Sequence, residues 1–208
     1  MKPLILGITG GIGSGKSCVG HLLASYCLAP LIDVDQCCRH LLERDQPGWK
    51  ALRAAFGQTF LRPDGAIDRV ALRRHIFENA DIRRQVDDLL HPLAREALRV
   101  QVGLQRSRLI LIEIPLLYEA GWRDEVDEVL VVYARPGARC CRIMRRDRVT
   151  RREAARAIAA QMSLEEKAAR AEMVIDNSGQ WAESRLRVVA LGDVLSRRIL
   201  DGLRKENS

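Results

Sequence analysis

The chain has 208 residues, of which 47% are hydrophobic and 29% charged, and its formal net charge is +7. These fractions are those of an ordinary soluble globular protein, and the length suits one domain, or one core with insertions. The longest apolar run, Leu109–Leu117, is interrupted by Glu113 and Pro115, which excludes a membrane-spanning helix, and the first residues lack a secretory pattern. We therefore expect a cytoplasmic protein with no membrane partner.

A glycine-rich loop follows the first predicted strand, Leu4–Thr9. Residues 10–17 have the sequence GGIGSGKS, which is the phosphate-loop pattern. The glycines let the backbone turn tightly and aim its N–H groups at a polyphosphate, and a predicted helix to about residue 28 adds the positive end of its dipole. This strand–loop–helix context predicts a nucleotide phosphate site. The alternative is a glycine-rich turn that binds nothing.

Two side chains at the end of the loop have separate expected roles. Lys16 would place its ammonium near the terminal phosphates. The Ser17 hydroxyl would ligate the Mg²⁺ that the phosphates carry, and it is the metal ligand that we predict.

The second predicted strand, Ala29–Asp33, ends on an acid. Ligands of parallel sheets bind beyond the carboxyl ends of the strands, where Asp33 lies. A phosphoryl acceptor hydroxyl needs a carboxylate that orients it and accepts its proton, so we predict that Asp33 is this base. The alternative is a cap for a helix beginning at Gln36, a role that Asp35 would fill equally well.

The segment from 36 to about 105 has a largely helical pattern. Arg62–Gly65 predicts a turn, and His91-Pro92 predicts a break, because the residue before a proline disfavours helical geometry. By itself, His91 is typical of a capping or packing histidine.

Two apolar segments, Leu109–Ile114 and Glu128–Tyr133, predict buried parallel strands. Glu113, near the end of the first, resembles the acid that supports Mg²⁺ in phosphate-loop enzymes. An equally good interpretation is a buried acid paired with a Lys or Arg. Pro115 then gives the strand a sharp exit.

An arginine-rich segment follows these strands. Nine arginines lie from Arg135 to Arg156, and the acids there are Asp147 and Glu153. The net charge favours an anionic partner, but aromatic residues for base stacking make up only 4% of the chain, so we expect no nucleic acid. An arginine segment that closes over polyphosphate is favoured, and a solvated basic helix is the alternative.

The arginines of this segment divide by helical face. Arg142 and Arg146, four residues apart, share one face and are the candidates for bidentate phosphate contacts. Arg139, Arg145 and Arg148 lie on other faces, where we expect solvated side chains.

A short strand, Met173–Asp176, and a helix from Trp181 to about residue 203 complete the chain. Five strands alternating with helices predict an α/β fold with a mostly parallel sheet covered on both faces. No Gly/Ser-rich or Pro-rich linker occurs, so we interpret both helical insertions as parts of one compact unit. The six cysteines lack C-x-x-C spacing, which predicts free thiols rather than a zinc site or disulfides.

Several motifs together resemble the dephospho-CoA kinase family. In chain order they are Gly7–Ser17, Ile32–Asp35, Asp64–Arg69 with Leu72-Arg73 and Ile76-Phe77, Leu90–Pro92, Ile114–Glu119, Arg142–Asp147, Gln161 and Val174–Asn177. They follow the order and spacing of the family from about residue 4 to beyond 180. The phosphate loop alone is common to many enzymes, whereas the His-Pro, Pro-Leu-Leu and Ile-Asp-Asn motifs are much narrower.

The resemblance implies ATP- and Mg²⁺-dependent phosphorylation of the ribose 3′-hydroxyl of dephospho-CoA, the last step of coenzyme A biosynthesis. It also implies a three-layer phosphate-loop fold similar to that of nucleoside-monophosphate kinases. The core would comprise residues 1–35, 106–138 and 172–208 of a single domain. Residues 36–105 would bind the acceptor, and residues 139–171 would form a mobile lid. We expect a monomer or a weak homo-oligomer.

The resemblance also assigns site residues. Catalysis would depend on Lys16, on Arg142 and on Asp33 as the base. The phosphate loop, two lid arginines and a residue beside the adenine would bind ATP: Gly11, Ile12, Gly13, Ser14, Gly15, Lys16, Ser17, Cys18, Arg142, Arg146 and Asn177. The acceptor would be bound by Thr9, Asp33, Arg73, His91, Pro115, Leu116 and Leu117. Cys18 stands where the family usually has Thr or another small residue, and we expect its side chain to point away from phosphate.

Three other functions fit part of the pattern. Another small-metabolite kinase would share the loop, core and lid, but the long helical insertion and the His-Pro motif argue against it. A nucleotide-dependent switch is weakened by the absence of a guanine-reading Asn-Lys-x-Asp stretch. Nucleic-acid binding is the third.

Overall fold

The computed structural model describes residues 2–206, and the chain divides into two compact units. One unit comprises Met1–Ile32 with Gln105–Ser208, and the other comprises Asp33–Leu104. The sequence predicts a single compact unit, whereas the helical insertion is a unit of its own with its own hydrophobic cluster.

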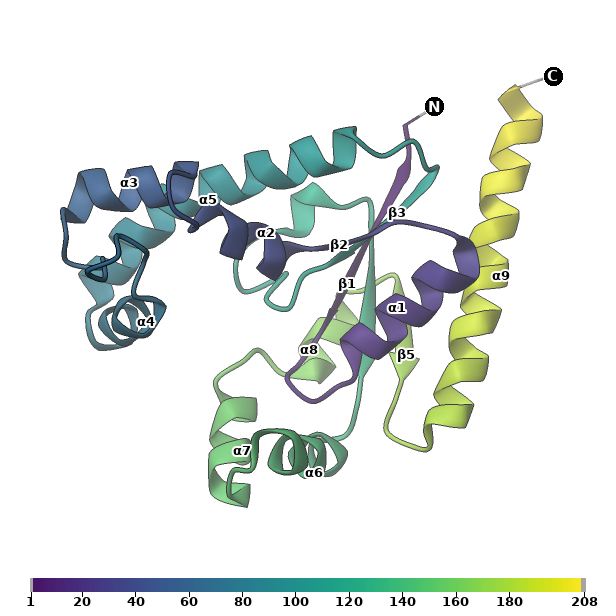
Figure 1. The fold of residues 1–208 in the computed structure, drawn as a ribbon. Coiled ribbons are helices and arrows are strands. Elements are labelled where there is room, and N and C mark those ends of the chain that lie inside the picture. The colour runs from purple at the N-terminus through teal and green to yellow at the C-terminus, as the bar shows by residue number, and fades with distance from the viewer. Residues whose placement is uncertain (1, 207–208) are drawn as a thin grey trace. The chain divides into compact units, whose positions relative to one another are not determined.

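A five-stranded sheet has the order β2-β3-β1-β4-β5 (Figure 1). The strands are β1 (Leu4–Gly10), β2 (Leu31–Asp33), β3 (Leu109–Glu113), β4 (Glu128–Tyr133) and β5 (Met173–Asp176). β1 pairs in parallel with β3 and β4, and β4 pairs in parallel with β5. All of β3 is buried, as expected for a parallel strand covered on both faces. The predicted α/β fold with five strands is confirmed.

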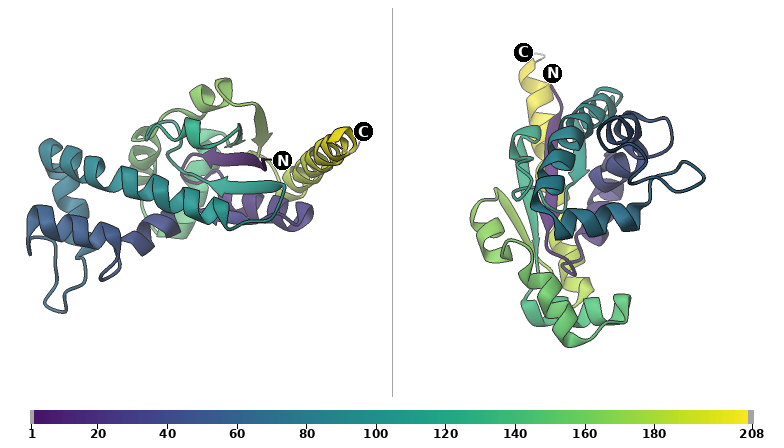
Figure 2. Two further views of the ribbon diagram at one scale, coloured as in Figure 1. Left: turned by 90° about the horizontal axis from the view of Figure 1, so that it is seen from above. Right: turned by 90° about the vertical axis from the view of Figure 1, so that its left-hand side faces the viewer.

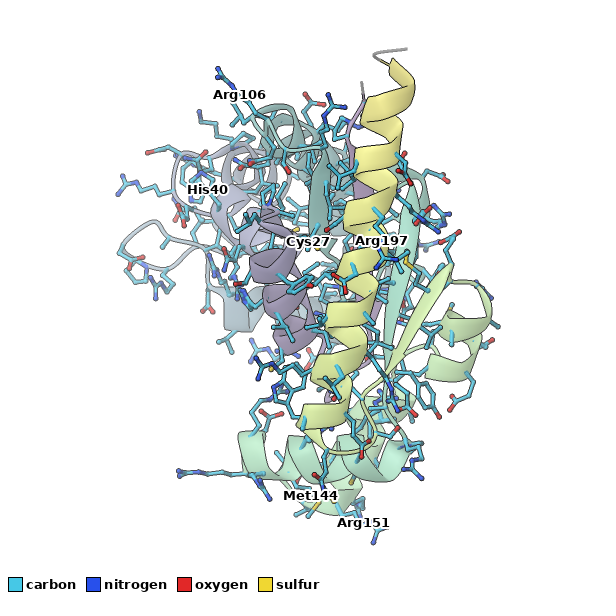
Figure 3. All side chains as sticks on the ribbon, turned by 90° about the vertical axis from the view of Figure 1, so that its right-hand side faces the viewer. Cys27, His40, Arg106, Met144, Arg151 and Arg197 are labelled. Carbon is cyan, nitrogen blue, oxygen red and sulfur yellow. The ribbon has the colours of Figure 1, made fainter. Side chains whose placement is uncertain are left out.

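Helices cover both faces of this sheet. In the unit that carries the loop they are α1 (Lys16–Cys27), α6 (Pro136–Asp147), α7 (Arg151–Ala159), α8 (Leu164–Ala169) and α9 (Trp181–Glu206), with a short 3-10 helix η1 (Arg123–Glu125). α1 and α9 pack against each other on one face, and α8 packs on β4 on the opposite face (Figure 2). The thiol of Cys27, at the end of α1, faces α9 (Figure 3), where its Sγ lies 3.8 Å from the Gly192 carbonyl oxygen.

The arginine-rich segment forms two helices, α6 and most of α7, and the short helix α8 follows it. α6 begins with Pro136, which suits a first helical turn because it needs no N–H there. Thr150 caps α7, and its hydroxyl and N–H form a capping box with Glu153. Ser163 caps α8 by accepting the Glu166 N–H at 3.1 Å. Figure 3 shows Met144 of α6 and Arg151 of α7 at the same end of the molecule.

The second unit is built from four helices: α2 (Val34–Leu41), α3 (Pro47–Phe56), α4 (Arg69–Glu78) and α5 (Ala80–Gly103). α5 packs against the other three helices. Buried residues of α3, α4, α5 and the segment between α3 and α4 form one cluster: Trp49, Leu52, Phe60, Ile67, Leu72 and Val86. The predicted turn is present, since the Gly65 N–H donates to the Arg62 carbonyl at 2.8 Å. None of the helices in the described residues is both long and apolar enough to cross a membrane.

Two expectations about this unit are wrong. α5 continues through Pro92, where the sequence predicts a break. Buried Val86 on one side of Pro92 and buried Ala94 and Leu98 on the other hold the helix together through packing. α2 begins at Val34 instead of Gln36, because the cap is the residue that ends β2.

Pro92 lies inside α5 and lacks the N–H that a helix interior uses. Pro92→Ala is therefore expected to raise the free energy of unfolding by about 1–2 kcal/mol, measured by urea denaturation followed by circular dichroism. Pro63→Ala, in the exposed turn outside any helix, is the control and should give no comparable gain. A lower stability of Pro92→Ala would show that the packing of α5 requires the proline.

Candidate active site

The loop between β1 and α1 has the backbone geometry that its glycines permit. Gly13 and Gly15 have φ angles of +76° and +89°, a region that favours glycine. The Ser14 N–H donates to the Gly11 carbonyl at 3.0 Å, which closes a tight turn. The loop leads directly into α1, whose first residue is Lys16. The predicted strand–loop–helix context of a phosphate loop is therefore present.

The carboxylate of Glu113 contacts both functional side chains at the end of the loop. Lys16 Nζ forms an ion pair with Glu113 Oε1, and Ser17 Oγ donates to the same oxygen at 2.6 Å. Glu113 is only 7% exposed. The interpretation of Glu113 as a buried acid paired with a lysine is confirmed. The carboxylate also lies beside Ser17, the predicted Mg²⁺ ligand, and its own role toward Mg²⁺ stays a prediction. A hydroxyl and a carboxylate are donors that Mg²⁺ prefers.

Arg142 and Asn177 hold the carbonyl groups of the loop. Arg142 Nη1 lies 3.3 Å from the Gly13 oxygen and 3.2 Å from the Ser14 oxygen, and its Nη2 donates to the Asn177 carbonyl at 2.7 Å. Asn177 is 4% exposed, and its Nδ2 donates to the Ser14 carbonyl at 2.7 Å. These two residues, assigned to ATP by the resemblance, fix the shape of the loop from outside.

The other arginines of α6 differ from one another. Arg146 forms two hydrogen bonds with Asp147, at 2.7 and 2.8 Å, which raise the pKa of Arg146 and lower the pKa of the Asp147 carboxyl. Arg145 and Arg148 are exposed, as expected. The expectation of a solvated Arg139 is wrong, since this side chain is 3% exposed.

A cavity of about 380 Å³ opens on the same helix. It is lined by Ala138, Cys141, Arg142, Arg145 and Arg146. The lining combines three arginines with the small Ala138, which suits a ligand that carries phosphate.

The turn after α7 contacts the phosphate loop through Gln161. Its Oε1 accepts the Ile12 N–H at 2.8 Å. The Ile12 N–H is one of the loop donors, so this amide oxygen occupies the kind of position that a phosphate oxygen would take.

The Pro115 carbonyl receives hydrogen bonds from two sides. Thr9 Oγ1 and Lys167 Nζ each donate to it at 3.2 Å. Lys167 also pairs with Glu119 Oε1 at 2.8 Å, and the same oxygen accepts the Met162 N–H at 3.2 Å. Thr9 and Pro115, both predicted to bind acceptor, are thus brought together and linked to the turn before α8.

Lys167 is fully buried at 0% exposure. Burial lowers the pKa of its ammonium; Glu119 opposes this shift, and the charges of Arg139 and Lys16 add to it. Lys167 is therefore influenced by other cations around the loop, and Glu119 is the acid that pairs with it.

The remaining predicted residues of this unit differ in exposure. Leu116 is 44% exposed, whereas Leu117 is fully buried. A Cβ added to Gly7 would lie only 3.0 Å from the Leu117 side chain, so Leu117 packs closely on β1. Any contact of Leu117 with acceptor would therefore involve its backbone. Cys18 is exposed on α1.

Asp33 is the N-cap of α2. Its Oδ1 accepts the N–H groups of Asp35 and Gln36 at 2.8 and 3.3 Å, and its Oδ2 lies 3.6 Å from Arg39 Nη2. The capping interpretation therefore holds for Asp33 itself, and Asp35 is capped rather than capping. Because capping uses Oδ1, the second oxygen is the one available to a substrate hydroxyl, and its catalytic role stays a prediction.

Two further predicted residues belong to the same helical unit. Arg73 is exposed on α4. His91 lies on α5 with its Nε2 3.8 Å from Asp87 Oδ1, one helical turn away. Their roles toward the acceptor also stay predictions.

The comparison with protein families decides the assignment. The family model of dephospho-CoA kinase matches residues 4–183. The chain belongs to the dephospho-CoA kinase family. This confirms the resemblance found in the motifs, which extend over the same part of the sequence.

Relatives agree with this membership of the dephospho-CoA kinase family. A dephospho-CoA kinase from Geobacter sulfurreducens is 41% identical over 187 residues, covering 88% of this chain and 94% of that protein. One from Geobacillus kaustophilus is 37% identical over 191 residues, covering 90% and 94%.

Solved structures support the fold. TT1252 from Thermus thermophilus has a TM-score of 0.81 at 34% identity, covering 95% of this chain and 98% of its own. A dephospho-CoA kinase from Campylobacter jejuni has a TM-score of 0.69 at 24% identity, covering 95% and 98%. A shikimate kinase from Bacteroides thetaiotaomicron has a TM-score of 0.52 at 15% identity, so the fold extends to other small-metabolite kinases.

Sequence reasoning missed three residues around the site of this dephospho-CoA kinase family member. Gln161 entered only as one of the family motifs, without a role. Arg139 was expected in solvent, and Lys167 drew no expectation, because one lysine in a charged helical segment looks like any other. Their contacts join elements far apart in sequence, and no local pattern predicts such contacts.

The Lys167–Glu119 pair provides a stability test. Lys167→Met removes a fully buried cation and leaves Glu119 without its ion-pair partner, so we expect a loss of about 2–3 kcal/mol in the free energy of unfolding. Glu119→Gln in the same background should cost less than it does alone. The measurement is a double-mutant cycle by chemical denaturation, and additive effects would contradict a direct interaction.

Proposed function

We propose that this chain transfers the γ-phosphoryl group of ATP to the ribose 3′-hydroxyl of dephospho-CoA and releases coenzyme A and ADP. The proposal rests on the phosphate loop, whose Lys16 and Ser17 side chains both donate hydrogen bonds to the buried Glu113 carboxylate. Membership of the dephospho-CoA kinase family gives the acceptor.

The reaction is an in-line displacement at the γ-phosphorus. A bond forms between the acceptor O3′ and phosphorus while the bond from phosphorus to the β,γ-bridging oxygen breaks, and ADP leaves. Asp33 accepts the proton of the 3′-hydroxyl through the carboxylate oxygen that does not cap α2. The loop N–H groups bind the phosphates, and Lys16 exchanges Glu113 for the terminal phosphates.

The donor set at the loop fits Mg²⁺. Ser17 Oγ and Glu113 Oε1 are oxygen atoms 2.6 Å apart, and the two side chains would hold the ion together with phosphate oxygens and water. Bound Mg²⁺ would neutralise charge on the β- and γ-phosphates.

The other segments have supporting roles in this proposal. The helical unit Asp33–Leu104 binds the acceptor, with Arg73 and His91 among its contacts. Residues 139–171 act as a lid that excludes water from the phosphoryl group, and Arg146 exchanges Asp147 for phosphate on closure. We further propose that the enzyme is a monomer or a weak homo-oligomer that acts in the cytoplasm.

Steady-state ADP formation tests the proposed reaction. Wild-type protein should form ADP rapidly only when dephospho-CoA is present, and shikimate, gluconate and nucleoside monophosphates should not replace it. Lys16→Ala should lower kcat by at least about 100-fold, because it removes the cation at the terminal phosphates. Lys2→Ala, with an exposed side chain, is the control. Slow ATP hydrolysis unaffected by any acceptor would favour a nucleotide-dependent switch.

Asp33→Asn separates the two roles of Asp33. Asn caps helices as well as Asp does, so the stability should stay within about 0.5 kcal/mol of wild type. The loss of the proton acceptor should lower kcat by about 100-fold or more, with little change in the KM for ATP. Asp35→Asn removes a neighbouring carboxylate and should retain activity. Full activity of Asp33→Asn would refute the catalytic role.

A further inference from the structure

Arg139 is the one buried arginine of the basic segment from Arg135 to Arg156. It lies in the first turn of α6 and is 3% exposed. Burying a guanidinium costs free energy unless a partner neutralises its charge. The burial of this one arginine, on a helix whose other arginines are more exposed, therefore needs an explanation.

Arg139 contacts three consecutive residues of the phosphate loop. Its Nε donates to the Ile12 carbonyl at 2.9 Å. A Cβ on Gly11 would lie 2.2 Å from Nη2, and a Cβ on Gly13 would lie 2.8 Å from the backbone oxygen of Arg139. The guanidinium therefore lies directly against the loop, in space that a side chain at position 11 would fill.

The charge of Arg139 is not neutralised by an ion pair among the described residues. Its Nη2 is buried without a hydrogen-bond partner there. The acid whose charge acts on Arg139 is Glu165, whose Oε1 already accepts the hydroxyl of Tyr133 at 3.0 Å. Burial accordingly lowers the pKa of the Arg139 guanidinium, and Glu165 opposes this shift.

The Ile12 carbonyl and the Gly13 N–H belong to one planar peptide. A cation that binds the carbonyl end fixes the orientation of this peptide and polarises its N–H end, which makes the Gly13 N–H a better donor to an anion. A positive charge buried against the loop also acts on phosphates bound there, with little screening by water.

We propose that Arg139 is a positioning residue for the nucleotide phosphates: its buried guanidinium orients the Ile12–Gly13 peptide and holds an unneutralised positive charge against the loop. The proposal rests on ATP binding to this loop, as in the proposed function. The charge destabilises the protein without nucleotide and is compensated when the polyanion binds.

Opposite effects on stability and affinity distinguish this role from a structural one. Arg139→Gln keeps an N–H donor for the Ile12 carbonyl and removes the charge. We expect its melting temperature without nucleotide to rise by about 2–4 °C, while its Kd for ATP, measured by calorimetry, increases about tenfold. The KM for ATP should increase similarly, with kcat within about twofold and the KM for dephospho-CoA unchanged.

Two further variants complete the test. Arg139→Lys keeps the charge and should retain ATP affinity within about threefold of wild type. Arg148→Gln removes one exposed charge from the end of the same helix and should leave both ATP affinity and melting temperature unchanged.

These measurements distinguish a failure of the proposed function from a failure of the proposed role of Arg139. Wild-type protein that does not bind ATP would refute the proposed function. Wild-type protein that binds ATP no more tightly than Arg139→Gln would refute the role of Arg139 alone. A loss of both stability and affinity in Arg139→Gln would show a structural arginine, and a Lys variant as weak as the Gln variant would exclude the charge as the cause.

Discussion

The contact of Glu113 with Lys16 and Ser17 links the sheet to the loop on which the site depends. It joins the end of β3 to the first turn of α1, and it neutralises the loop lysine when no phosphate is there to do so. The same carboxylate would lie beside a nucleotide-bound cation. In the proposed function this buried acid would serve two states of the site, since its lysine partner would be exchanged for phosphate while the carboxylate stays.

The loop itself is held from its carbonyl side. Arg139, Arg142 and Asn177 donate to the carbonyl groups of residues 12–14, so these loop carbonyls have hydrogen-bond donors before any ligand arrives. An electrostatically preorganised site of this kind reorganises little during reaction. It also concentrates buried cations that weaken the fold, which is the usual compromise between stability and function.

The sequence predicts the strands well, because each is a short apolar run bounded by turn residues. The sequence also predicts that Lys16 and Ser17 lie at the end of the phosphate loop, because their spacing from the glycines is a local pattern. The sequence does not predict features that are determined by contacts between distant elements. Packing on both sides of Pro92 overrides a local helix breaker, and the approach of α6 to the loop determines that Arg139 is buried while Arg145 stays exposed. For Asp33, local sequence offers capping and catalysis as alternatives; the structure shows capping through Oδ1, and the catalytic role stays a prediction.

The C-terminal helix extends beyond the residues that the family model matches. The match ends at residue 183, whereas α9 continues to Glu206 and contributes Val188 and Leu195, both fully buried, to the core around α1. Gly192 lets the two helices approach closely, since a Cβ there would lie 2.4 Å from the Tyr26 ring. A truncation at the end of the family-model match, residue 183, would expose the apolar side of α1, the helix whose first turn carries Lys16. The packing of α9 thus helps to hold α1, and with it the loop lysine, in place.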